Sequence, residues 1–450
     1  MIMGAFKAYD IRGVYNKDFG KEDVYKIGYF LPELLDTKKI LVGRDVRISS
    51  PEIFAFLCKG IEDAGATVYD LGITTTPMVY WATAEFKFMA SVMITASHNP
   101  KEYNGLKISR ENALPVGYDT GLGQLERWLQ ERIVTPVSKK GKVVEFSQKE
   151  AYLQFQKKWV KDISNLNIAM DCSNGMASIF VRDLYGNQPH YIFDTLDGTF
   201  PNHEANPLEP ENIVDIQKLV QKVHADIGVV FDGDADRVMF VDENSKFISP
   251  DLMIAVLGLY FLKEKGLKGN VLQDIRTSKA VKTYIEKLGG SMEMWRVGRA
   301  YAALKLREID GVFGGELAGH YYFRDFNYSD SGLMASSLLL HIFSEYKKKG
   351  KTVSQLIMEI ATYANSGEIN LRIEDKEGAM EALKNYFTAK EEPIAFFDFD
   401  GYRIEFTQWW FNVRPSNTEP YLRLIMEATN QKILQEKLAK ANEILEKWLA

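Results

Sequence analysis

Cysteine is scarce in this chain, which carries two among its 450 residues, Cys58 and Cys172. Two thiols provide no disulfide framework, and their scarcity fits a reducing compartment. The first residues, Met1 to Lys7, lack the basic-then-apolar layout of a signal peptide, and no apolar run approaches membrane-spanning length. We therefore expect a cytoplasmic protein without a membrane partner.

Positive charge is also in short supply. The chain has 55 Lys and Arg against 61 Asp and Glu, which gives a net charge of -6. An acidic balance argues against a nucleic-acid partner. Apolar residues, by contrast, make up 46% of the sequence. A chain of this length and composition can bury large cores and should divide into several domains.

An apolar strand that ends in a polar turn with an aspartate occurs three times. The turns carry Asp45, Asp171 and Asp274, and each is followed by a stretch with helical periodicity. This recurrence indicates three similar α/β units with mostly parallel strands.

The segment Thr95-Ala96-Ser97-His98-Asn99-Pro100 follows the apolar run from Ser91 to Ile94. A buried strand cannot continue through Asn-Pro, so Ser97 and His98 should lie on a loop at the strand's carboxyl end. Open α/β sheets bind ligands at that edge, which makes Ser97 a candidate nucleophile. Taken alone, a turn serine that bonds nearby backbone remains the alternative.

Three carboxylates at alternate positions, Asp232, Asp234 and Asp236, lie between two apolar runs. They can converge on one cation, and hard oxygen ligands favour Mg²⁺ or Ca²⁺. An EF-hand is disfavoured because Arg237 occupies the position that needs glycine. An acidic hairpin turn that faces water is a further alternative. Arg237 itself is best explained as a phosphate contact beside the metal.

Two more polar segments have the character of ligand loops. In the segment 314–320, glycines on both sides of Glu316 and His320 let the backbone approach a ligand, and the Glu316 carboxylate can accept two hydroxyl protons of a sugar. The segment 414–420 combines an arginine, two hydroxyls and an amide between prolines, which suits a phosphate cradle. Either segment alone is equally typical of a polar turn.

The four segments, in this order, resemble the α-D-phosphohexomutase family, and the resemblance extends from Tyr9 to near the carboxyl end. Within the family, the segment 414–420 resembles the phosphomannomutase/phosphoglucomutase branch. Asn417 is the distinguishing residue, because the phosphoglucosamine branch usually has Gly at this position. The resemblance implies an α/β fold with three similar α/β domains with mixed sheets and a smaller C-terminal α+β domain around a central cleft. The implied domains are 1–145 with the phosphoserine loop, 146–253 with the metal loop, 254–365 with the sugar loop and 366–450 with the phosphate loop.

The family resemblance also implies the chemistry, which is interconversion of hexose 6-phosphate and hexose 1-phosphate through a phosphoserine enzyme and a hexose 1,6-bisphosphate intermediate. It implies Mg²⁺ bound by phosphorylated Ser97, Asp232, Asp234 and Asp236. Lys107 is our first candidate for the general base, because neighbouring arginines could lower its pKa, and His98 and His320 are the alternatives. The other implied catalytic and substrate-binding residues are Arg12, His98, Arg237, Arg299, Glu316, Ala318, His320, Arg414, Ser416, Asn417 and Thr418.

Two residues depart from the family pattern. Ala318 replaces a usual Ser in the sugar loop, which puts hydroxyl discrimination in doubt. Arg299 stands where a His is common, which makes it a candidate phosphate contact. The alternative functions are a phosphoglucosamine mutase, a non-catalytic sugar-phosphate-binding protein and a Mg²⁺ phosphatase. We expect a phosphorylated hexose as the partner, and a monomer or weak homo-oligomer.

Overall fold

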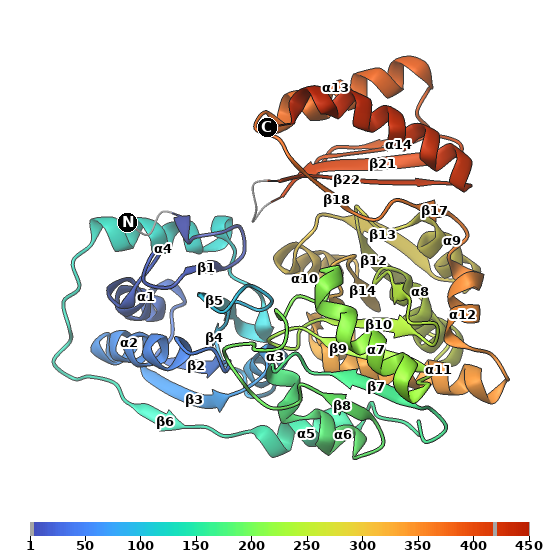
Figure 1. Ribbon diagram of the computed structural model, residues 1–450. Coiled ribbons are helices and arrows are strands. Elements are labelled where there is room, and N and C mark those ends of the chain that lie inside the picture. The colour runs from blue at the N-terminus through green and yellow to red at the C-terminus, as the bar shows by residue number, and fades with distance from the viewer. Residues whose placement is uncertain (1–3, 417–420, 450) are drawn as a thin grey trace.

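The computed structural model of the chain describes residues 4–416 and 421–449 (Figure 1). Three α/β units are followed by a smaller fourth unit, which lies above the third in Figure 1. Within the described ranges, no helix is both long and apolar enough to cross a bilayer.

The first three sheets repeat one arrangement of strands. The orders are β1-β5-β4-β2-β3-β6, β11-β10-β9-β7-β8 and β13-β12-β14-β15-β16. In each, a central strand (β2, β7 or β12) pairs in parallel with both neighbours, and one neighbour continues into an antiparallel hairpin (β4-β5, β9-β10 or β14-β15). The expected trio of similar α/β units with mixed sheets is therefore confirmed.

The strand bounds in these units follow chain order. The first unit has β1 Ile11–Val14, β2 Lys39–Arg44, β3 Thr67–Ile73, β4 Ala90–Ile94, β5 Tyr103–Arg110 and β6 Val143–Glu145. The second has β7 Ile168–Asp171, β8 His190–Ile192, β9 Ile227–Phe231, β10 Val238–Asp242 and β11 Phe247–Ile248. The third has β12 Asn270–Asp274, β13 Ser291–Trp295, β14 Phe313–Gly315, β15 Tyr321–Phe323 and β16 Ser329–Asp330.

The aspartate at the carboxyl end of each central strand makes the same local contact. Its Oδ1 accepts a hydrogen bond from the backbone N–H two residues later, at 3.0 Å for Asp45, 2.7 Å for Asp171 and 2.7 Å for Asp274. Such a turn satisfies a backbone donor that the strand no longer pairs. The three aspartates found in the sequence are thus equivalent positions in the repeated unit.

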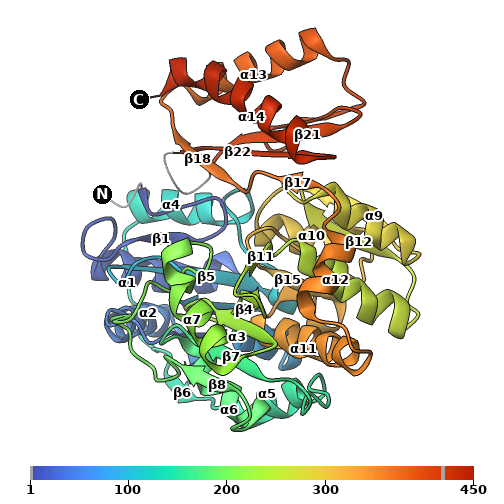
Figure 2. The ribbon, with the colours of Figure 1, turned by 45° about the vertical axis from the view of Figure 1, so that its right-hand side comes forward.

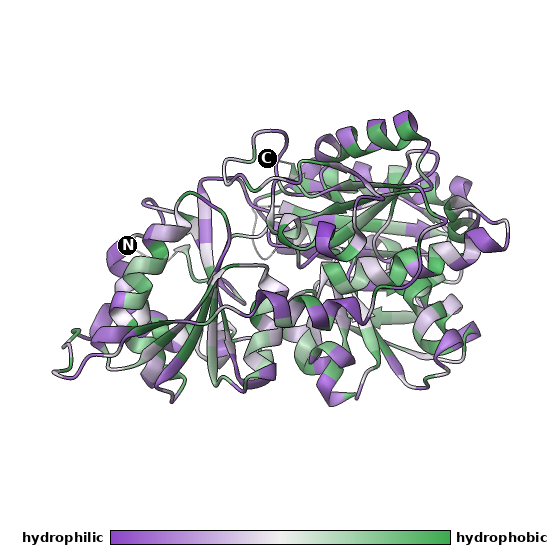
Figure 3. Ribbon diagram, turned by 90° about the horizontal axis from the view of Figure 1, so that it is seen from below, coloured by the Kyte–Doolittle hydropathy of each residue, from purple (hydrophilic) through white to green (hydrophobic). Residues whose placement is uncertain are grey.

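Helices flank the sheets, and Figure 3 shows most strands in green, with helices divided between green and purple faces. This pattern is expected where one stripe of each helix packs on a sheet. The helices are α1 Lys21–Leu34, α2 Ser50–Asp63, α3 Thr76–Glu85, α4 Leu122–Glu131, α5 Lys149–Lys157, α6 Val181–Tyr185, α7 Val214–Val223, α8 Leu252–Gly258, α9 Lys279–Lys287, α10 Arg299–Glu308, α11 Gly332–Lys348, α12 Val353–Ile360, α13 Lys376–Lys390 and α14 Gln431–Leu445.

One hydrophobic core joins the first three units, because α3 of the first unit is apolar on nearly every side and packs between the others. The first unit also has a separate core, to which α1 and α2 contribute. The ring of Trp81 on α3 lies 5.3 Å from that of Tyr152 on α5, which in turn lies 5.2 Å from Phe180. The same apolar cluster continues into α8 and α11 of the third unit. These units are therefore fixed to one another by buried apolar contacts rather than by a flexible linker.

The fourth unit has its own core and an antiparallel sheet of order β17-β22-β21-β20-β19, with β18 also paired to β22. Its helices α13 and α14 cover the sheet face turned away from the other units (Figure 2). The smaller α+β unit expected from the family resemblance is confirmed. Its strands are β17 Ala364–Asn365, β18 Ile369–Arg372, β19 Ala395–Phe397, β20 Tyr402–Glu405, β21 Trp409–Pro415 and β22 Tyr421–Ala428.

One end of this unit differs from our expectation. Strand β17, at residues 364–365, pairs with β22 of the fourth sheet, although we had placed these residues at the end of the third domain. Their backbone hydrogen bonds assign them to the sheet of the fourth unit. The tryptophans at 409 and 410 are buried in β21 and belong to the packing of this unit.

Candidate active site

The four units enclose a cleft of about 1000 Å³. Equivalent hairpins of the first three units contribute the candidate loops, because Ser97 follows β4, Asp232 follows β9 and Glu316 follows β14. The lining residues named by our sequence analysis are Arg12, His98, Lys107, Asp236, Arg237, Arg299, Glu316, Ala318, His320, Arg414 and Ser416.

Ser97 lies buried where the first and second units meet. Its Oγ donates a hydrogen bond to Oδ2 of Asp232 at 2.8 Å and lies 3.4 Å from Nδ1 of His98. The backbone φ of Ser97 is 52°, a left-handed conformation that a non-glycine residue adopts only where the surroundings hold it. A Cβ on Gly233 would lie 2.4 Å from the carbonyl oxygen of Ser97, so the two loops touch through their backbones.

Arg47 holds the serine loop, and our sequence analysis did not single it out. Its Nη2 donates to the carbonyl oxygens of Ser97 at 2.9 Å and Asn99 at 2.6 Å, and Nη1 donates to Pro100 and Tyr103. The side chain is buried, so these carbonyls have a charged donor in place of water. In the sequence, Arg47 could have been found from its position two residues after Asp45, where its backbone N–H closes the turn.

The three aspartates converge in the β9-β10 hairpin loop. Asp232, Asp234 and Asp236 are buried, and one oxygen from each lies within 4.8 Å of the others. Strands on both sides exclude the EF-hand alternative, and burial excludes an acidic turn facing water. Burial raises the pKa of Asp232 well above its usual value, and the charges of Asp236 and Asp234 add to this.

The donor set fits a divalent cation. The Oδ1 atoms of Asp234 and Asp236 are buried and, among the described residues, have no hydrogen-bond partner. Clustered buried carboxylate oxygens that have no hydrogen-bond partner are stabilised by a hard cation. The trio therefore can bind a metal.

Lys107, on β5, is paired with this trio. Its Nζ lies 2.7 Å from Oδ2 of Asp234 and 2.6 Å from Oδ2 of Asp236. Burial alone would lower the pKa of Lys107, but the two carboxylates outweigh it and raise the pKa well above its usual value. Our expectation that arginines lower this pKa is wrong, because the closest charges are negative. Burial, aided by Arg237 and Arg12, lowers the pKa of His98 well below its usual value.

The candidate sugar loop is anchored at both ends. Oε1 of Glu316 accepts hydrogen bonds from Tyr322 Oη at 2.8 Å and from the Gly298 backbone at 3.2 Å. Ala318 lines the cleft, and its methyl side chain carries no hydroxyl group. His320 contacts Arg237 of the metal loop at 2.9 Å, and the two residues also form a backbone bridge.

Arg299 lines the cleft but contacts protein groups. Its Nε lies 3.1 Å from Oδ1 of Asp330, its Nη2 donates to the carbonyl of Ala113 at 3.0 Å, and its guanidinium lies 3.6 Å from the ring centre of Tyr80. These contacts join the third unit to the first. They account for a partly buried arginine at this position without a phosphate ligand.

Cations from the first and fourth units complete the cleft. Nη1 of Arg12, on β1, donates to Oδ1 of Asn99 at 2.9 Å, so its guanidinium group lies against the serine loop. Nε of Arg414 donates to Asp400 at 2.9 Å, while its Nη2 is buried and has no hydrogen-bond partner in the described part of the chain. Ser416 lines the cleft beside Arg414. The expected ligands Asn417 and Thr418 lie outside the described residues.

Known protein families match each of the four units described above. Four domain families described as phosphoglucomutase/phosphomannomutase domains I, II, III and the C-terminal domain match residues 3–127, 146–245, 249–363 and 368–443. The chain belongs to the phosphoglucomutase/phosphomannomutase family. It is 35% identical to a phosphomannomutase of Methanocaldococcus jannaschii, with 98% of this chain and 97% of the relative covered.

Two further relatives agree. A phosphomannomutase of Escherichia coli K12 is 34% identical, with 96% of each chain covered. The crystal structure of a phosphoglucomutase/phosphomannomutase family protein from Burkholderia thailandensis superposes with a TM-score of 0.87 at 26% identity and covers 100% of this chain and 99% of its own. The relatives therefore match the whole arrangement rather than a single domain.

Proposed function

We propose that this chain is a phosphohexomutase, an intramolecular phosphotransferase that interconverts hexose 6-phosphate and hexose 1-phosphate, with mannose or glucose as the sugar. One observation carries the assignment of the nucleophile. The Oγ of Ser97 is buried and lies 2.8 Å from Asp232 of the acidic trio, and the neighbouring His98 and Asp236 line a cleft that also presents Arg12, Arg237 and Arg414. Ser97 would carry the phosphate that is passed to the sugar.

The acidic trio would hold Mg²⁺ together with an oxygen of phosphorylated Ser97. When bound, Mg²⁺ would polarise the phosphoryl group and neutralise charge that develops during transfer. The protein's own cations add to that neutralisation. Arg12 lies against the serine loop and Arg237 against the trio, so both guanidinium groups are placed before substrate binds.

Proton transfer needs a group near each oxygen. Nδ1 of His98, 3.4 Å from the Ser97 Oγ, is placed to accept the serine proton when that oxygen attacks a phosphoryl group, because the lowered pKa of His98 keeps the ring neutral. His320 and Lys107 line the same cleft as candidates for the sugar hydroxyl, but both ring nitrogens of His320 already have partners in this structure, Asp330 and Arg237. The two carboxylates that hold Lys107 suit a positive charge better than a base.

The other end of the cleft would bind the rest of the substrate. Glu316 would accept hydrogen bonds from neighbouring sugar hydroxyls. Arg414 and Ser416, with Asn417 and Thr418, would hold the phosphate that is not reacting. A hexose 1,6-bisphosphate intermediate that reverses its orientation would then present either phosphate to the same cradle, so one serine serves both directions.

The test replaces Ser97 by Ala and compares it with Ser109→Ala, a buried serine on β5 that does not line the cleft. We expect Ser97→Ala to lose mutase activity by orders of magnitude, and mass spectrometry to find phosphate on Ser97 of the parent protein. Glucose 1-phosphate, mannose 1-phosphate and glucosamine 1-phosphate are assayed in parallel, with free phosphate monitored. Near-normal activity in Ser97→Ala would refute the relay, and faster release of free phosphate than of isomer would indicate a phosphatase.

A further inference from the structure

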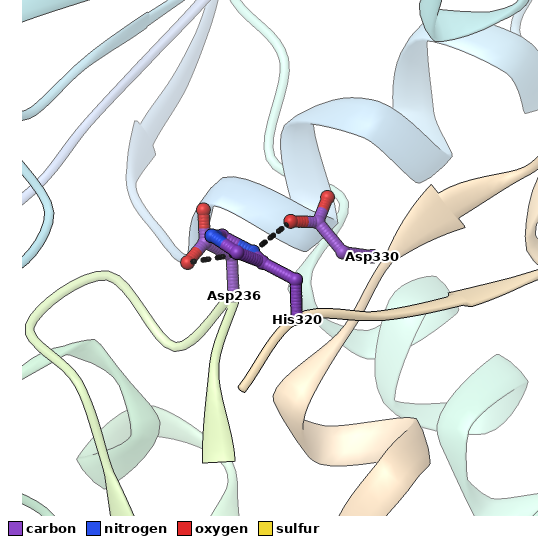
Figure 4. A group of neighbouring side chains, drawn as sticks. All are labelled: Asp236, His320 and Asp330. Carbon is purple, nitrogen blue, oxygen red and sulfur yellow. Dashed lines mark hydrogen bonds and ion pairs between the residues drawn. The ribbon is translucent and has the colours of Figure 1, made fainter. Parts of the chain in front are cut away.

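The imidazole of His320 lies between two buried carboxylates (Figure 4). Its Nδ1 is 2.5 Å from Oδ2 of Asp330 and 3.8 Å from Oδ1 of Asp236. On the opposite side of the ring, Nε of Arg237 donates to Nε2 at 2.9 Å. Asp330 was not singled out by the sequence, because it lies ten residues beyond the sugar loop on the short strand β16.

These contacts define which nitrogen of His320 carries the proton. A guanidinium group can only donate hydrogen bonds, so Nε2 must accept from Arg237. A neutral imidazole has one N–H, which therefore lies on Nδ1 and points to the carboxylate of Asp330. In a doubly protonated ring, the N–H on Nε2 would face the N–H on Nε of Arg237, and no hydrogen bond could form between them.

Asp330 is itself held rigidly. Strand β16 pairs with β15, where Asp330 lies opposite Tyr322. Its Oδ1 lies 3.1 Å from Nε of Arg299, whose Nη2 donates to the Ala113 carbonyl in the first unit. The residue is fully buried, so water does not compete for these contacts. Its carboxylate is therefore a fixed reference for the imidazole.

The contact with His320 helps to fix the position of the Arg237 guanidinium group. Its backbone N–H donates to Oδ1 of Asp232 at 3.2 Å, and its Nε lies 3.8 Å from Oδ2 of Asp232 and 3.9 Å from Oδ1 of Asp236. Because Asp232 also accepts the Ser97 hydroxyl, the guanidinium group lies beside the candidate phosphoryl position.

We propose that Asp330 is a positioning residue for phosphoryl transfer: it holds His320 in the Nδ1-protonated tautomer, so that Nε2 accepts from Arg237 and keeps the guanidinium directed at the transferring phosphate. The inference rests on the proposed function. Asp330 touches neither substrate nor metal in this scheme, and it acts through His320.

The variant Asp330→Asn tests the tautomer with little change in volume. With its carboxamide NH₂ turned to Nδ1, the ring must accept there and carry its proton on Nε2, opposite the Arg237 donor. The guanidinium then loses its support. We expect kcat to fall about a hundredfold, the scale on which one preorganised group that stabilises transition-state charge contributes, and KM to change little. Thermal unfolding checks that the variant is folded.

Two readouts separate positioning from a merely structural role. Nitrogen-15 NMR of histidine-labelled protein, with His320→Gln to assign the signal, reports the tautomer directly. We expect Nδ1–H in the parent protein and in Arg299→Gln, which removes the other partner of Asp330, and Nε2–H in Asp330→Asn. In the His320→Gln background, Asp330→Asn should lower kcat no further, because the two residues act in series.

The outcomes are distinct for this inference and for the proposed function. Nε2–H in the parent protein, unchanged kcat in Asp330→Asn, or a further loss in the double variant would each overturn the role of Asp330. If the parent protein shows no mutase activity and no phosphate on Ser97, the proposed function fails, and the role of Asp330 in transfer fails with it. An active parent with an unaffected Asp330→Asn variant contradicts this inference alone.

Discussion

Replacing Lys107 by Met should destabilise the metal-free protein by about 3–5 kcal/mol, the usual result of removing one partner from a buried ion pair. The Nζ of Lys107 lies 2.7 and 2.6 Å from two buried carboxylates, and the lysine side chain itself is only 13% exposed. A divalent cation would neutralise the same carboxylates. The free energy of unfolding should therefore recover when Mg²⁺ is added, and it should recover more in Lys107→Met than in the parent protein.

The affinity for Mg²⁺ should rise in the same variant. Two unit charges 4 Å apart interact by about 4 kcal/mol at an effective dielectric constant of about 20, so the lysine repels an incoming cation. Relief of only part of this repulsion, about 1.4 kcal/mol, already tightens binding tenfold. We expect a tightening of at least that size, together with a loss of turnover, because the lysine charge is also missing during transfer.

Urea unfolding with EDTA or saturating Mg²⁺, together with calorimetric titration of Mg²⁺, measures both effects. Lys59→Met is the matched control, because Lys59 forms a 2.8 Å pair with Asp63 but its side chain is 57% exposed. Such a surface pair contributes less than about 1 kcal/mol and should not respond to Mg²⁺. Equal destabilisation of Lys107→Met with and without Mg²⁺, or weaker Mg²⁺ binding, would show that the lysine and the metal do not compete.

Three other predictions concern single residues. Gly233→Ala places a Cβ 2.4 Å from the Ser97 carbonyl, so kcat should fall at least about tenfold as the two loops separate, whereas Gly20→Ala, whose Cβ meets no atom closer than 3.7 Å, should leave kcat unchanged. Glu316→Gln should lower kcat/KM for mannose and glucose phosphates together, since both present the same diol; loss of one alone would mean that Glu316 reads the second carbon. Burial raises the pKa of Asp251 to about 6, so the folded protein keeps a proton that the unfolded chain releases, and stability falls as pH rises from about 4 to 6. Asp251→Asn should remove about 3 kcal/mol of that dependence in urea titrations, and an unchanged pH slope would contradict the assignment.

The sequence predicted much of this architecture because the repeated unit leaves a local mark. A strand that ends in an aspartate turn is readable in the chain, and all three such turns make the same hydrogen bond. The acidic trio was also readable, since three carboxylates within five residues can meet without any long-range contact. Its burial was not readable, because it depends on the β4-β5 loop of another unit.

Residues that support the candidate loops from outside them were not found in the sequence. Arg47 lies 50 residues before Ser97, and Asp330 lies 10 residues after His320 on a different element, so neither belongs to the segment that it supports. The pKa of Lys107 was misjudged for the same reason, since its nearest charges come from residues more than a hundred positions away. The role assigned to Arg299 rested on the absence of a histidine, whereas its three protein contacts are visible only in the folded chain.

The distribution of the cores decides where this chain can be divided. Any break between the first three units would expose the aromatic packing of Trp81 and Tyr152 to water. The fourth unit keeps its own apolar centre, so the segment from Ile360 to Ala364 is the natural place for recombination. That module carries Arg414 and the rest of the proposed distal phosphate cradle. Exchange of this module between relatives could therefore alter how a substrate is bound while the serine and the acidic trio stay untouched, whereas the sugar loop packs against it through Leu317.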